Sequence, residues 1–337
     1  MKRSIIITDT AIYHPDNRVE NSYYIDHFDK QGKDIRRMLE AFGRESRYIS
    51  DKPEENSLTM AIEASRRLLQ KTGLTGADLD IIVFSSGTPE YIAPSNAIHI
   101  HHALEGKDAS LVYDMNTNCV GMVIAMDQVA KYMQADSRIK RALIVGAEQM
   151  NRFSRTTNEL TYPNFGDAAC AVLLEAKDLE GEEQHQGFMD SVMLTKSYRY
   201  NVMALPGKGM SRIYDTSLTE EDKRIYWDTN DDGGASFLLA AQSIEELLER
   251  NQISKDQVKM YFLSQLSKKN ISRVREELGE PGHKFKFVGD RYGYTGTSSP
   301  FLALHHAVED GEIQRGDYIL FWSVGAGSIS SCALMKY

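Results

Sequence analysis

The chain has few cysteines, no long apolar run and no excess of positive charge. Its three cysteines are Cys119, Cys170 and Cys332, and their spacing matches no metal-binding motif. No window approaches the roughly 20 apolar residues that cross a bilayer, and the apolar run at 5–7 is too short for the core of a signal peptide. We therefore expect a cytoplasmic protein with reduced thiols, no metal site and no membrane partner.

Basic residues are outnumbered by acidic ones, 39 to 48, which gives a formal charge of −9. This balance argues against a nucleic-acid partner, because such proteins need a basic face to neutralise phosphates. Hydrophobic residues make up 42% of the chain and low-complexity tracts are absent, so we expect a folded globular protein.

Two parts of the chain repeat nearly the same order of helices and apolar strands. After a first strand at the N-terminus, the first part predicts helix 59–72, strand 80–86, helix 95–104, strand 110–114, a helix from 119, and strands 142–146 and 168–174. The second part predicts helix 236–250, strand 259–264, helix 267–279, strand 284–289, helix 298–310, and strands 317–323 and 330–336. Continuous apolar strands between helices indicate sheets covered on both faces, so both parts are predicted to be α/β.

The segment 177–235 differs from its surroundings. It is acidic and lacks apolar periodicity, as in DLEGEEQ and DTNDDGG. We expect a connector that carries an insertion on the substrate side, with one half at 1–176 and the other at 177–337.

The stretch MNTNCVGMVIAM places Cys119 between a predicted strand and a helix that is apolar nearly all round. Such a helix is expected to be buried between layers. Free N–H groups and the positive end of the helix would favour a thiolate at Cys119 and could hold an oxyanion, and Gly121 would allow close approach. A packing role is the alternative, and it is the stronger interpretation for Cys170 and Cys332, which lie inside predicted strands.

Seven segments match the motifs of one known family in order and spacing. They are FGRESRYISD, SSGTPEYIAPSNA, DMNTNCVGMVIAMDQVAKYM, ALIVGAEQM, NFGDAACAVLLE, RYGYTGTSS and GDYILFWSVGAGSISSCALMKY. The chain thereby resembles the β-ketoacyl-ACP synthase III (KAS III) group of thiolase-fold enzymes. The resemblance implies a five-layer αβαβα sandwich of two pseudo-duplicated halves, a homodimer, and no tightly bound cofactor. It also implies that Cys119 accepts an acyl group from acyl-CoA or acyl-ACP, with the N–H of Cys119 and of Gly325 or Gly327 as the oxyanion hole.

Both partners of the family's cysteine are replaced. The family has histidine in a Pro-His-Gln-Ala-Asn segment and asparagine in a His-Gly-Asn-Thr segment, where this chain reads LSQLSKKN and YGYTG. Family spacing puts Ser264 at the histidine, retains Gln265, and puts Tyr294 at the asparagine. Neither replaces imidazole as a base at neutral pH, and no histidine lies in a motif that would substitute. We hypothesise that Tyr294, with Ser264 or Gln265, positions a carbonyl or an acceptor while the helix end activates Cys119.

Further candidates lie on the substrate side. Arg37 stands at a family tryptophan that lines the pantetheine tunnel, and Lys268 and Lys269 match a basic position used against acyl carrier protein; a solvated helix face is the alternative for the lysines. Glu90 is a candidate base in a loop that approaches the tunnel in related enzymes, with a solvent-exposed carboxylate as the alternative. Glu148 is a weaker candidate.

Three functions are consistent with these residues. The first is an acyltransferase that passes an acyl group from Cys119 to an acceptor in fatty-acid-related or polyketide-like metabolism. The second is a true 3-oxoacyl-ACP synthase III that condenses the acyl group with malonyl-ACP, with another base such as Glu90. The third is an inactive subunit that pairs with an intact relative; the retained cysteine counts against it.

Overall fold

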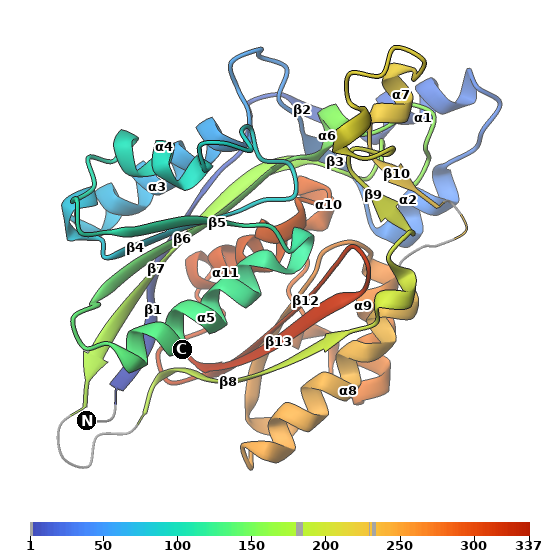
Figure 1. Ribbon diagram of the computed structural model, residues 1–337. Coiled ribbons are helices and arrows are strands. Elements are labelled where there is room, and N and C mark those ends of the chain that lie inside the picture. Colours follow the sequence, from blue (N-terminus) through green and yellow to red (C-terminus); the bar gives the residue numbers. More distant parts are fainter. Residues whose placement is uncertain (1–2, 180–184, 229, 231–233) are drawn as a thin grey trace.

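The computed structural model describes residues 3–179, 185–228, 230 and 234–337. Its main sheet contains β1 (Arg3–Tyr13), β4 (Ile81–Ser85), β5 (Leu111–Met115), β6 (Arg141–Gln149), β7 (Asp167–Asp178), β8 (Gly187–Thr195), β11 (Val258–Leu263), β12 (Tyr318–Gly325) and β13 (Ile329–Lys336). In the described part of the chain, these strands form one 9-stranded sheet in the order β11-β12-β13-β8-β1-β7-β6-β4-β5 (Figure 1). Shorter strands form two small sheets, β2 (Arg18–Glu20) with β3 (Ser46–Tyr48) and β9 (Met203–Ala204) with β10 (Tyr226–Trp227).

The two halves of the main sheet repeat one topology. In the first half β1 pairs antiparallel with β7, β7 antiparallel with β6, and β6 parallel with β4. In the second half β8, β13, β12 and β11 follow the same order and the same directions. A parallel pair between Ile5 and Gly187 joins the halves. The predicted pseudo-duplicated α/β fold is confirmed.

The helices form the remaining layers. The longer ones are α3 (Ser57–Thr72), α4 (Asn96–Ala103), α5 (Gly121–Ala135), α8 (Gly234–Arg250), α9 (Lys268–Leu278) and α11 (Ser299–Glu309), and the shorter ones are α1 (Asn21–Asp29), α2 (Arg36–Phe42), α6 (Met150–Phe153), α7 (Glu220–Lys223) and α10 (Gly289–Tyr292). Helices α5 and α11 contact strands of both halves, whereas α3 and α4 cover one outer face and α8 the other, with α9 packed on α8. The result is the expected five-layer sandwich. Every helix in the described ranges is too short or too polar to cross a membrane.

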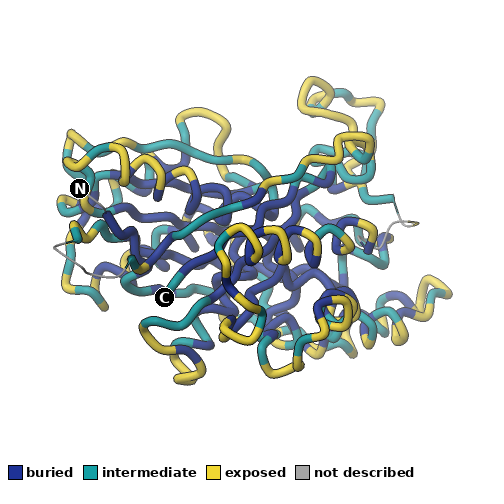
Figure 2. The backbone as a smooth tube through the Cα atoms, turned by 90° about the horizontal axis from the view of Figure 1, so that it is seen from below, coloured by how far each residue is buried: buried dark blue, intermediate teal, exposed yellow. Residues whose placement is uncertain are grey.

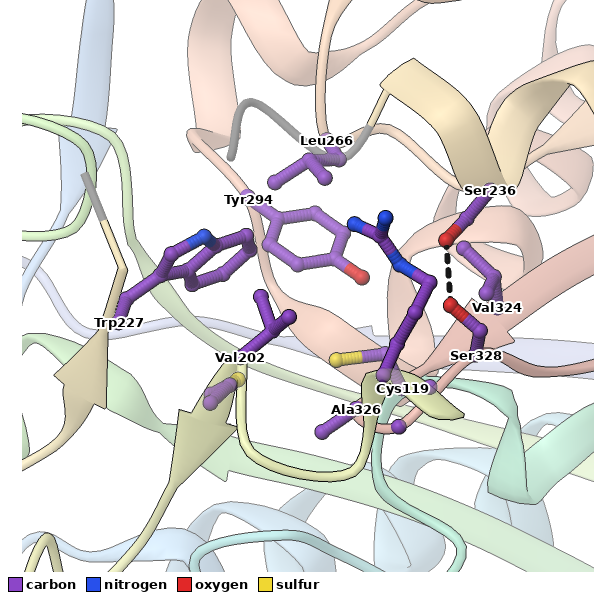
Figure 3. A pocket seen from close by; sticks show the side chains of 13 residues that line it. Cys119, Val202, Trp227, Ser236, Leu266, Tyr294, Val324, Ala326 and Ser328 are labelled. Carbon is purple, nitrogen blue, oxygen red and sulfur yellow. Dashed lines mark hydrogen bonds between the residues drawn. The ribbon is translucent and has the colours of Figure 1, made fainter. Parts of the chain in front are cut away.

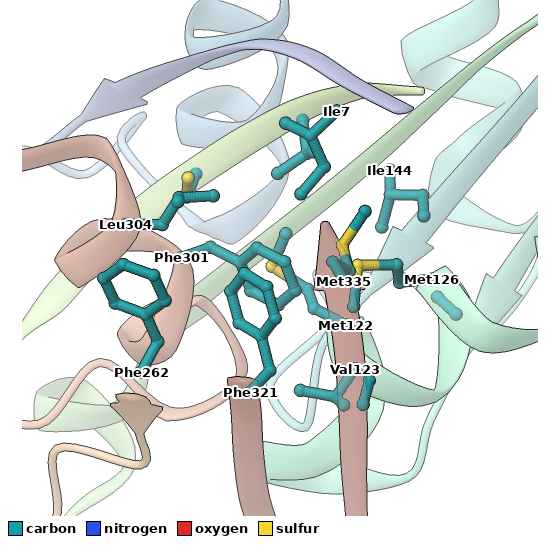
Figure 4. Packing of buried hydrophobic residues seen from close by; sticks show 14 of the residues in the cluster. Ile7, Met122, Val123, Met126, Ile144, Phe262, Phe301, Leu304, Phe321 and Met335 are labelled. Carbon is teal, nitrogen blue, oxygen red and sulfur yellow. The ribbon is translucent and has the colours of Figure 1, made fainter. Parts of the chain in front are cut away.

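The central layer is the most buried part of the molecule. Figure 2 shows buried segments running through the middle and exposed segments on the outer turns. Met122, Val123 and Met126 of α5 are buried, and they lie among Phe321 and Met335 of the second half (Figure 4). The all-round apolar pattern therefore correctly predicted a helix buried between layers, here between the two halves of the main sheet.

The predicted strand 284–289 is wrong. Only Phe285 bridges to Tyr261 of β11, and a 3₁₀ turn precedes it. The side chain of Gln265 accounts for the difference, because it accepts a hydrogen bond from the Val288 N–H at 2.9 Å and donates to the Lys286 carbonyl at 3.3 Å. The side-chain amide of Gln265 thus forms hydrogen bonds with backbone groups that would bond to a neighbouring strand if the strand were longer.

The segment 177–235, expected as a connector with an insertion, also supplies a strand of the main sheet. Strand β8 enters between β1 and β13, and Gly187 begins it with φ +81°. A Cβ at Gly187 would lie 1.9 Å from the Ile5 carbonyl oxygen, so only glycine permits this close approach. The other described residues of the segment include β9, α7, β10 and 3₁₀ turns at Ser197–Arg199 and Met210–Arg212.

Candidate active site

Cys119 lies in a 3₁₀ turn, Asn118–Val120, between β5 and α5. Asn118 before it has φ +54°, a left-handed conformation that few non-glycine residues adopt. The Cys119 carbonyl accepts a hydrogen bond from Ser323 Oγ at 2.7 Å, and the Met122 N–H donates to Thr297 Oγ1 at 2.8 Å. The turn is therefore fixed from the second half of the molecule, and Cys119 is 8% exposed.

Tyr294 and Ser264 form a hydrogen-bonded chain with the cysteine. The Tyr294 phenol is hydrogen-bonded to the Cys119 thiol, and Ser264 Oγ donates to the Tyr294 hydroxyl at 3.1 Å. Backbone bonds hold Tyr294 in place: its N–H donates to the Asn164 carbonyl at 2.8 Å and its carbonyl accepts from the Gly166 N–H at 3.0 Å. The structure thus brings together the three residues that family spacing placed in one site; their roles stay predictions.

Arg44 supports the loops that carry this chain. It is buried, and its guanidinium donates to the carbonyls of Gln265, Leu266 and Gly289 at 2.7, 2.8 and 2.9 Å and to Asn164 Oδ1. Burial lowers its pKa to about 9. The sequence contained a signal that was missed: FGRESR resembles a Gly-Ile-x-x-Arg segment of the family, and Arg44 stands at the position of the isoleucine. Gln265 uses its side chain to hold the backbone, as described above, rather than to face Cys119.

The Cys119 thiol is protonated at neutral pH. Burial, followed by the negative charge of Glu148, raises its pKa to about 12, although the hydrogen bond from Tyr294 acts in the opposite direction. The sequence predicted that the helix end would favour a thiolate, and burial acts in the opposite direction. Helix α5 begins only at Gly121, and burial outweighs its end charge.

Glu148, near the end of β6, is a residue of the site that the sequence indicated only as a weaker candidate. Its carboxylate accepts hydrogen bonds from the N–H groups of Gly87 and Thr88 at 3.0 Å, from Thr88 Oγ1 at 2.7 Å and from Ser86 Oγ at 3.2 Å. Burial nevertheless raises the pKa of this carboxyl. Among the described residues, Glu148 is the only carboxylate lining the cavities that contain Cys119.

Cys119 lies where two cavities meet. The larger has a volume of about 440 Å³ and is lined by Glu148 and by residues of the insertion such as Leu205. The smaller has a volume of about 50 Å³ and contains Tyr294 and Trp227 (Figure 3). Ala326 and its neighbour at 327 line both cavities, so the turn between β12 and β13 faces the thiol.

The two predicted oxyanion glycines belong to this turn. Gly325 and Gly327 both line the smaller cavity. Gly327 has φ +79°, and a Cβ at Gly325 would lie 2.6 Å from the Thr117 carbonyl oxygen. Glycine at these two positions therefore leaves the turn without side chains between its backbone and Cys119, and the oxyanion role of the two N–H groups stays a prediction.

The other predicted site residues lie outside the cavities. Glu90 is exposed in the loop between β4 and α4 and lines neither cavity. Arg37 of α2 and Lys268 and Lys269 of α9 are exposed on two helices that pack together. The structure thus places these three cations on one outer region rather than beside Cys119.

Cys170 and Cys332 are completely buried inside β7 and β13. Burial raises the pKa of both thiols above the ordinary range. The predicted packing role fits both positions.

Comparisons with known proteins agree with this architecture. The model for "3-Oxoacyl-[acyl-carrier-protein (ACP)] synthase III" matches residues 113–197, and the model for its C-terminal part matches residues 248–337. A β-ketoacyl-[acyl-carrier-protein] synthase III of Solibacter usitatus is 28% identical over 304 residues, which cover 89% of each chain.

Solved structures share the fold. A 3-oxoacyl-[acyl-carrier-protein] synthase III of Aquifex aeolicus is 23% identical with a TM-score of 0.85, covering 99% of this chain and 100% of that one. The priming β-ketosynthase of the R1128 polyketide pathway is 21% identical with a TM-score of 0.88, covering 99% and 96%. Together with a cysteine turn and a glycine turn at the expected places, these matches show that the chain belongs to the KAS III-like family of thiolase-fold proteins.

Proposed function

We propose that this protein is an acyltransferase that forms an acyl-Cys119 intermediate from acyl-CoA or acyl-ACP and passes the acyl group to an acceptor. The observation that carries the proposal is the hydrogen-bonded chain from Ser264 through Tyr294 to Cys119, at the junction of two cavities. Its setting is fatty-acid-related or polyketide-like metabolism, and no resident cofactor takes part.

In the first step the Cys119 sulfur attacks the thioester carbonyl. The bond between the sulfur and the acyl carbon forms, the donor's C–S bond breaks, and the donor thiol leaves. The N–H groups of Cys119 and of Gly325 or Gly327 stabilise the oxyanion. Because the thiol pKa is about 12, its proton has to leave as the new bond forms. Glu148, close enough to raise that pKa, is the candidate proton acceptor, and it then returns the proton to the sulfur of the leaving donor.

Condensation with malonyl-ACP is the second candidate, because curated relatives are named as synthases of this type. It lacks support at the site. An enolate would need donors where the family has imidazole and amide groups, and Ser264 and Tyr294 stand there instead. Loss of one such donor typically costs about 10²- to 10³-fold in rate. Glu90, the candidate base for this reaction, is exposed.

An inactive partner subunit is the third candidate. A cavity of about 440 Å³ that reaches a cysteine nucleophile argues for a working site instead. The chain itself offers a surface for a homodimer. Strand β5 is an edge of the main sheet, and Leu111, Ile92 and Ile98 are exposed on β5 and around α4, which packs on it.

Acyl carrier protein is a further proposed partner. Arg37, Lys268 and Lys269 form a basic region on α2 and α9, and acidic carrier proteins bind such regions. Charge reversal at Lys269 would then slow acylation from acyl-ACP and leave acylation from acyl-CoA unchanged.

The decisive experiment is intact-protein mass spectrometry after incubation with a panel of acyl-CoA and acyl-ACP donors. We expect one adduct, mapped to Cys119, that is lost in Cys119→Ala and retained in Cys170→Ala. No adduct with any donor would favour the inactive subunit. A β-ketoacyl product from malonyl-ACP would establish the condensing enzyme instead.

A further inference from the structure

The lining of the larger cavity is partly apolar and partly polar. Its volume of about 440 Å³ has room for an acyl group attached to Cys119. The polar part of the lining includes Asn118 and Glu148, and the apolar part includes Met150, Leu205 and Ile225. An acyl group in this cavity therefore meets hydrogen-bonding groups as well as apolar side chains.

One oxygen of the Glu148 carboxylate can accept a further hydrogen bond. Oε2 accepts from Ser86 Oγ, from Thr88 Oγ1 and from the N–H groups of Gly87 and Thr88, at 2.7 to 3.2 Å. Among the described residues, Oε1 accepts only from the Gly87 N–H, at 3.0 Å. Since a carboxylate oxygen has two lone pairs, one lone pair of Oε1 is left for a ligand.

Gly87 leaves open a point that two acceptor oxygens border. A Cβ on Gly87 would lie 3.4 Å from Asn118 Oδ1 and 3.6 Å from Glu148 Oε1. Within the part of the chain that the structure describes, the side chain of Asn118 forms no hydrogen bond. All three residues line the larger cavity. The missing side chain at residue 87 thus leaves both oxygens uncovered at this point.

We propose that the larger cavity recognises a hydroxyl group on the acyl chain of the substrate, which donates a hydrogen bond to Glu148 Oε1 beside Asn118. The inference deepens the proposed acyl transfer and rests on it for the identity of the reaction. The substrate class is then a hydroxyacyl thioester, with its hydroxyl on a carbon close to the thioester carbonyl. The rest of the chain contacts the apolar part of the lining.

A hydroxyl group suits this position better than a charged group. A substrate carboxylate would meet the negative charge of Glu148. An ammonium group could bond to the carboxylate form of Glu148 only, whereas a hydroxyl donates to the carboxylate and accepts from the carboxylic acid. Both forms matter, because burial raises the pKa of Glu148 and the proposed first step protonates it. The hydroxyl forms and breaks no covalent bond, so the balance of that step is unchanged.

Loading of Cys119 by three matched pairs of CoA thioesters tests the proposal. Each pair exchanges a hydroxyl for a methyl group of similar size at one carbon. The pairs are 2-hydroxybutyryl with 2-methylbutyryl, 3-hydroxybutyryl with 3-methylbutyryl, and 4-hydroxybutyryl with pentanoyl. In one pair we expect the hydroxylated donor to load at least about tenfold faster at subsaturating concentration, because a hydrogen bond to a charged group is lost with the methyl compound. That pair identifies the carbon that carries the hydroxyl.

Three variants show whether the preference arises at the proposed point. Gly87→Ala puts a methyl group against both oxygens at ordinary contact distances, so the fold should be retained and the preference reduced to below about twofold. Asn118→Gly keeps the left-handed backbone, removes Oδ1 and should reduce the preference in part. Gly282→Ala, in an exposed turn, should retain all of it. A change in cavity volume affects both members of a pair alike.

Alkylation of Cys119 tests the hydroxyl site without acyl transfer. N-(2-hydroxyethyl)iodoacetamide and N-propyliodoacetamide form the same S–C bond with loss of iodide, and they differ by a hydroxyl in place of a methyl group. We expect the ratio of their rates at Cys119, divided by the ratio for free N-acetylcysteine, to be at least about threefold. Gly87→Ala should bring this ratio to about one, and Gly282→Ala should leave it unchanged.

The outcomes separate the two proposals. Where Cys119 is acylated, absence of a hydroxyl preference in all three pairs, or a preference that Gly87→Ala leaves unchanged, overturns the hydroxyl site and keeps the acyltransferase. Where no donor acylates Cys119, the acyltransferase is refuted and the alkylation ratio decides. A ratio that falls to about one in Gly87→Ala then supports the hydroxyl site, and a ratio of about one in the wild type overturns it.

Discussion

Replacement of Tyr294 by phenylalanine tests the link between the phenol and the thiol. The change removes one oxygen, which is hydrogen-bonded to Cys119 and accepts a hydrogen bond from Ser264 at 3.1 Å. The aromatic ring remains, so its packing against Phe165 is retained. The expected effect is on the acidity of the thiol, because the hydrogen bond from Tyr294 is what lowers a pKa that burial raises to about 12.

The size of this effect follows from three quantities. Thiolate is present at pH 8 at about one part in 10⁴ when the pKa is about 12. A hydrogen bond to a charged group contributes about 1.5–3 kcal/mol, so its loss raises the pKa of Cys119 by about one to two units. The more basic thiolate is also more nucleophilic, which offsets nearly half of that change. Alkylation of Tyr294→Phe should therefore be about 3- to 10-fold slower than that of the wild type.

The assay is alkylation of Cys119 by iodoacetamide between pH 7 and pH 10, followed by intact-protein mass spectrometry. Because both pKa values lie above this range, the rate should rise about tenfold per pH unit in both proteins, with the variant below the wild type throughout. Tyr261→Phe is a matched control, since its phenol is buried and, among described residues, has no hydrogen-bond partner. Equal rates for wild type and Tyr294→Phe over the whole range would refute the proposed link.

Three further predictions concern stability, measured by urea unfolding. Gly121→Ala puts a Cβ 2.1 Å from Ser85 Oγ and should lower the free energy of unfolding by about 1–3 kcal/mol. In a Ser85→Ala background the same change should lower it far less, and an equal loss in both backgrounds would contradict the clash. Arg44→Met leaves buried carbonyls without a donor and should lower the free energy of unfolding by about 3–5 kcal/mol. The control Arg212→Met, at an exposed arginine, should lower it by less than about 1 kcal/mol. Burial raises the pKa of Asp167 from its ordinary 3.8 to about 7. The contribution of Asp167 to the free energy of unfolding, present below pH 4, should therefore be lost as pH rises to about 7, and Asp167→Asn should flatten this part of the profile.

The sequence predicted most of the fold because most of its elements have a local cause. Apolar runs such as that of β6 and the all-round apolar start of α5 determine their own burial. The prediction of a strand at 284–289 was wrong for a non-local reason, because the side chain of Gln265, about twenty residues away, forms hydrogen bonds with backbone groups of this segment. Strand β8 was missed because its burial pattern is irregular and its surroundings are acidic.

Site residues could be predicted where family spacing applied. Residues that distant elements bring to the cavities could not. Spacing alone put Ser264 and Tyr294 next to Cys119. Nothing local indicated that Glu148 lines a cavity with Cys119, because elements far apart in sequence bring the two residues there. Glu148 is therefore a residue for which the structure adds a proposed role.

The state of the thiol shows why local sequence is a poor guide to reactivity. A helix end contributes about 0.3–2 kcal/mol to a nearby charge. The rise of the Cys119 pKa from 9.0 to about 12 corresponds to about 4 kcal/mol in the opposite direction. Burial therefore decides the outcome, and a resting thiolate is not available. In the proposed reaction, acylation then depends on the bound substrate and on Glu148, as the candidate acceptor, to remove the proton as the bond forms, which would link reactivity to occupancy of the site.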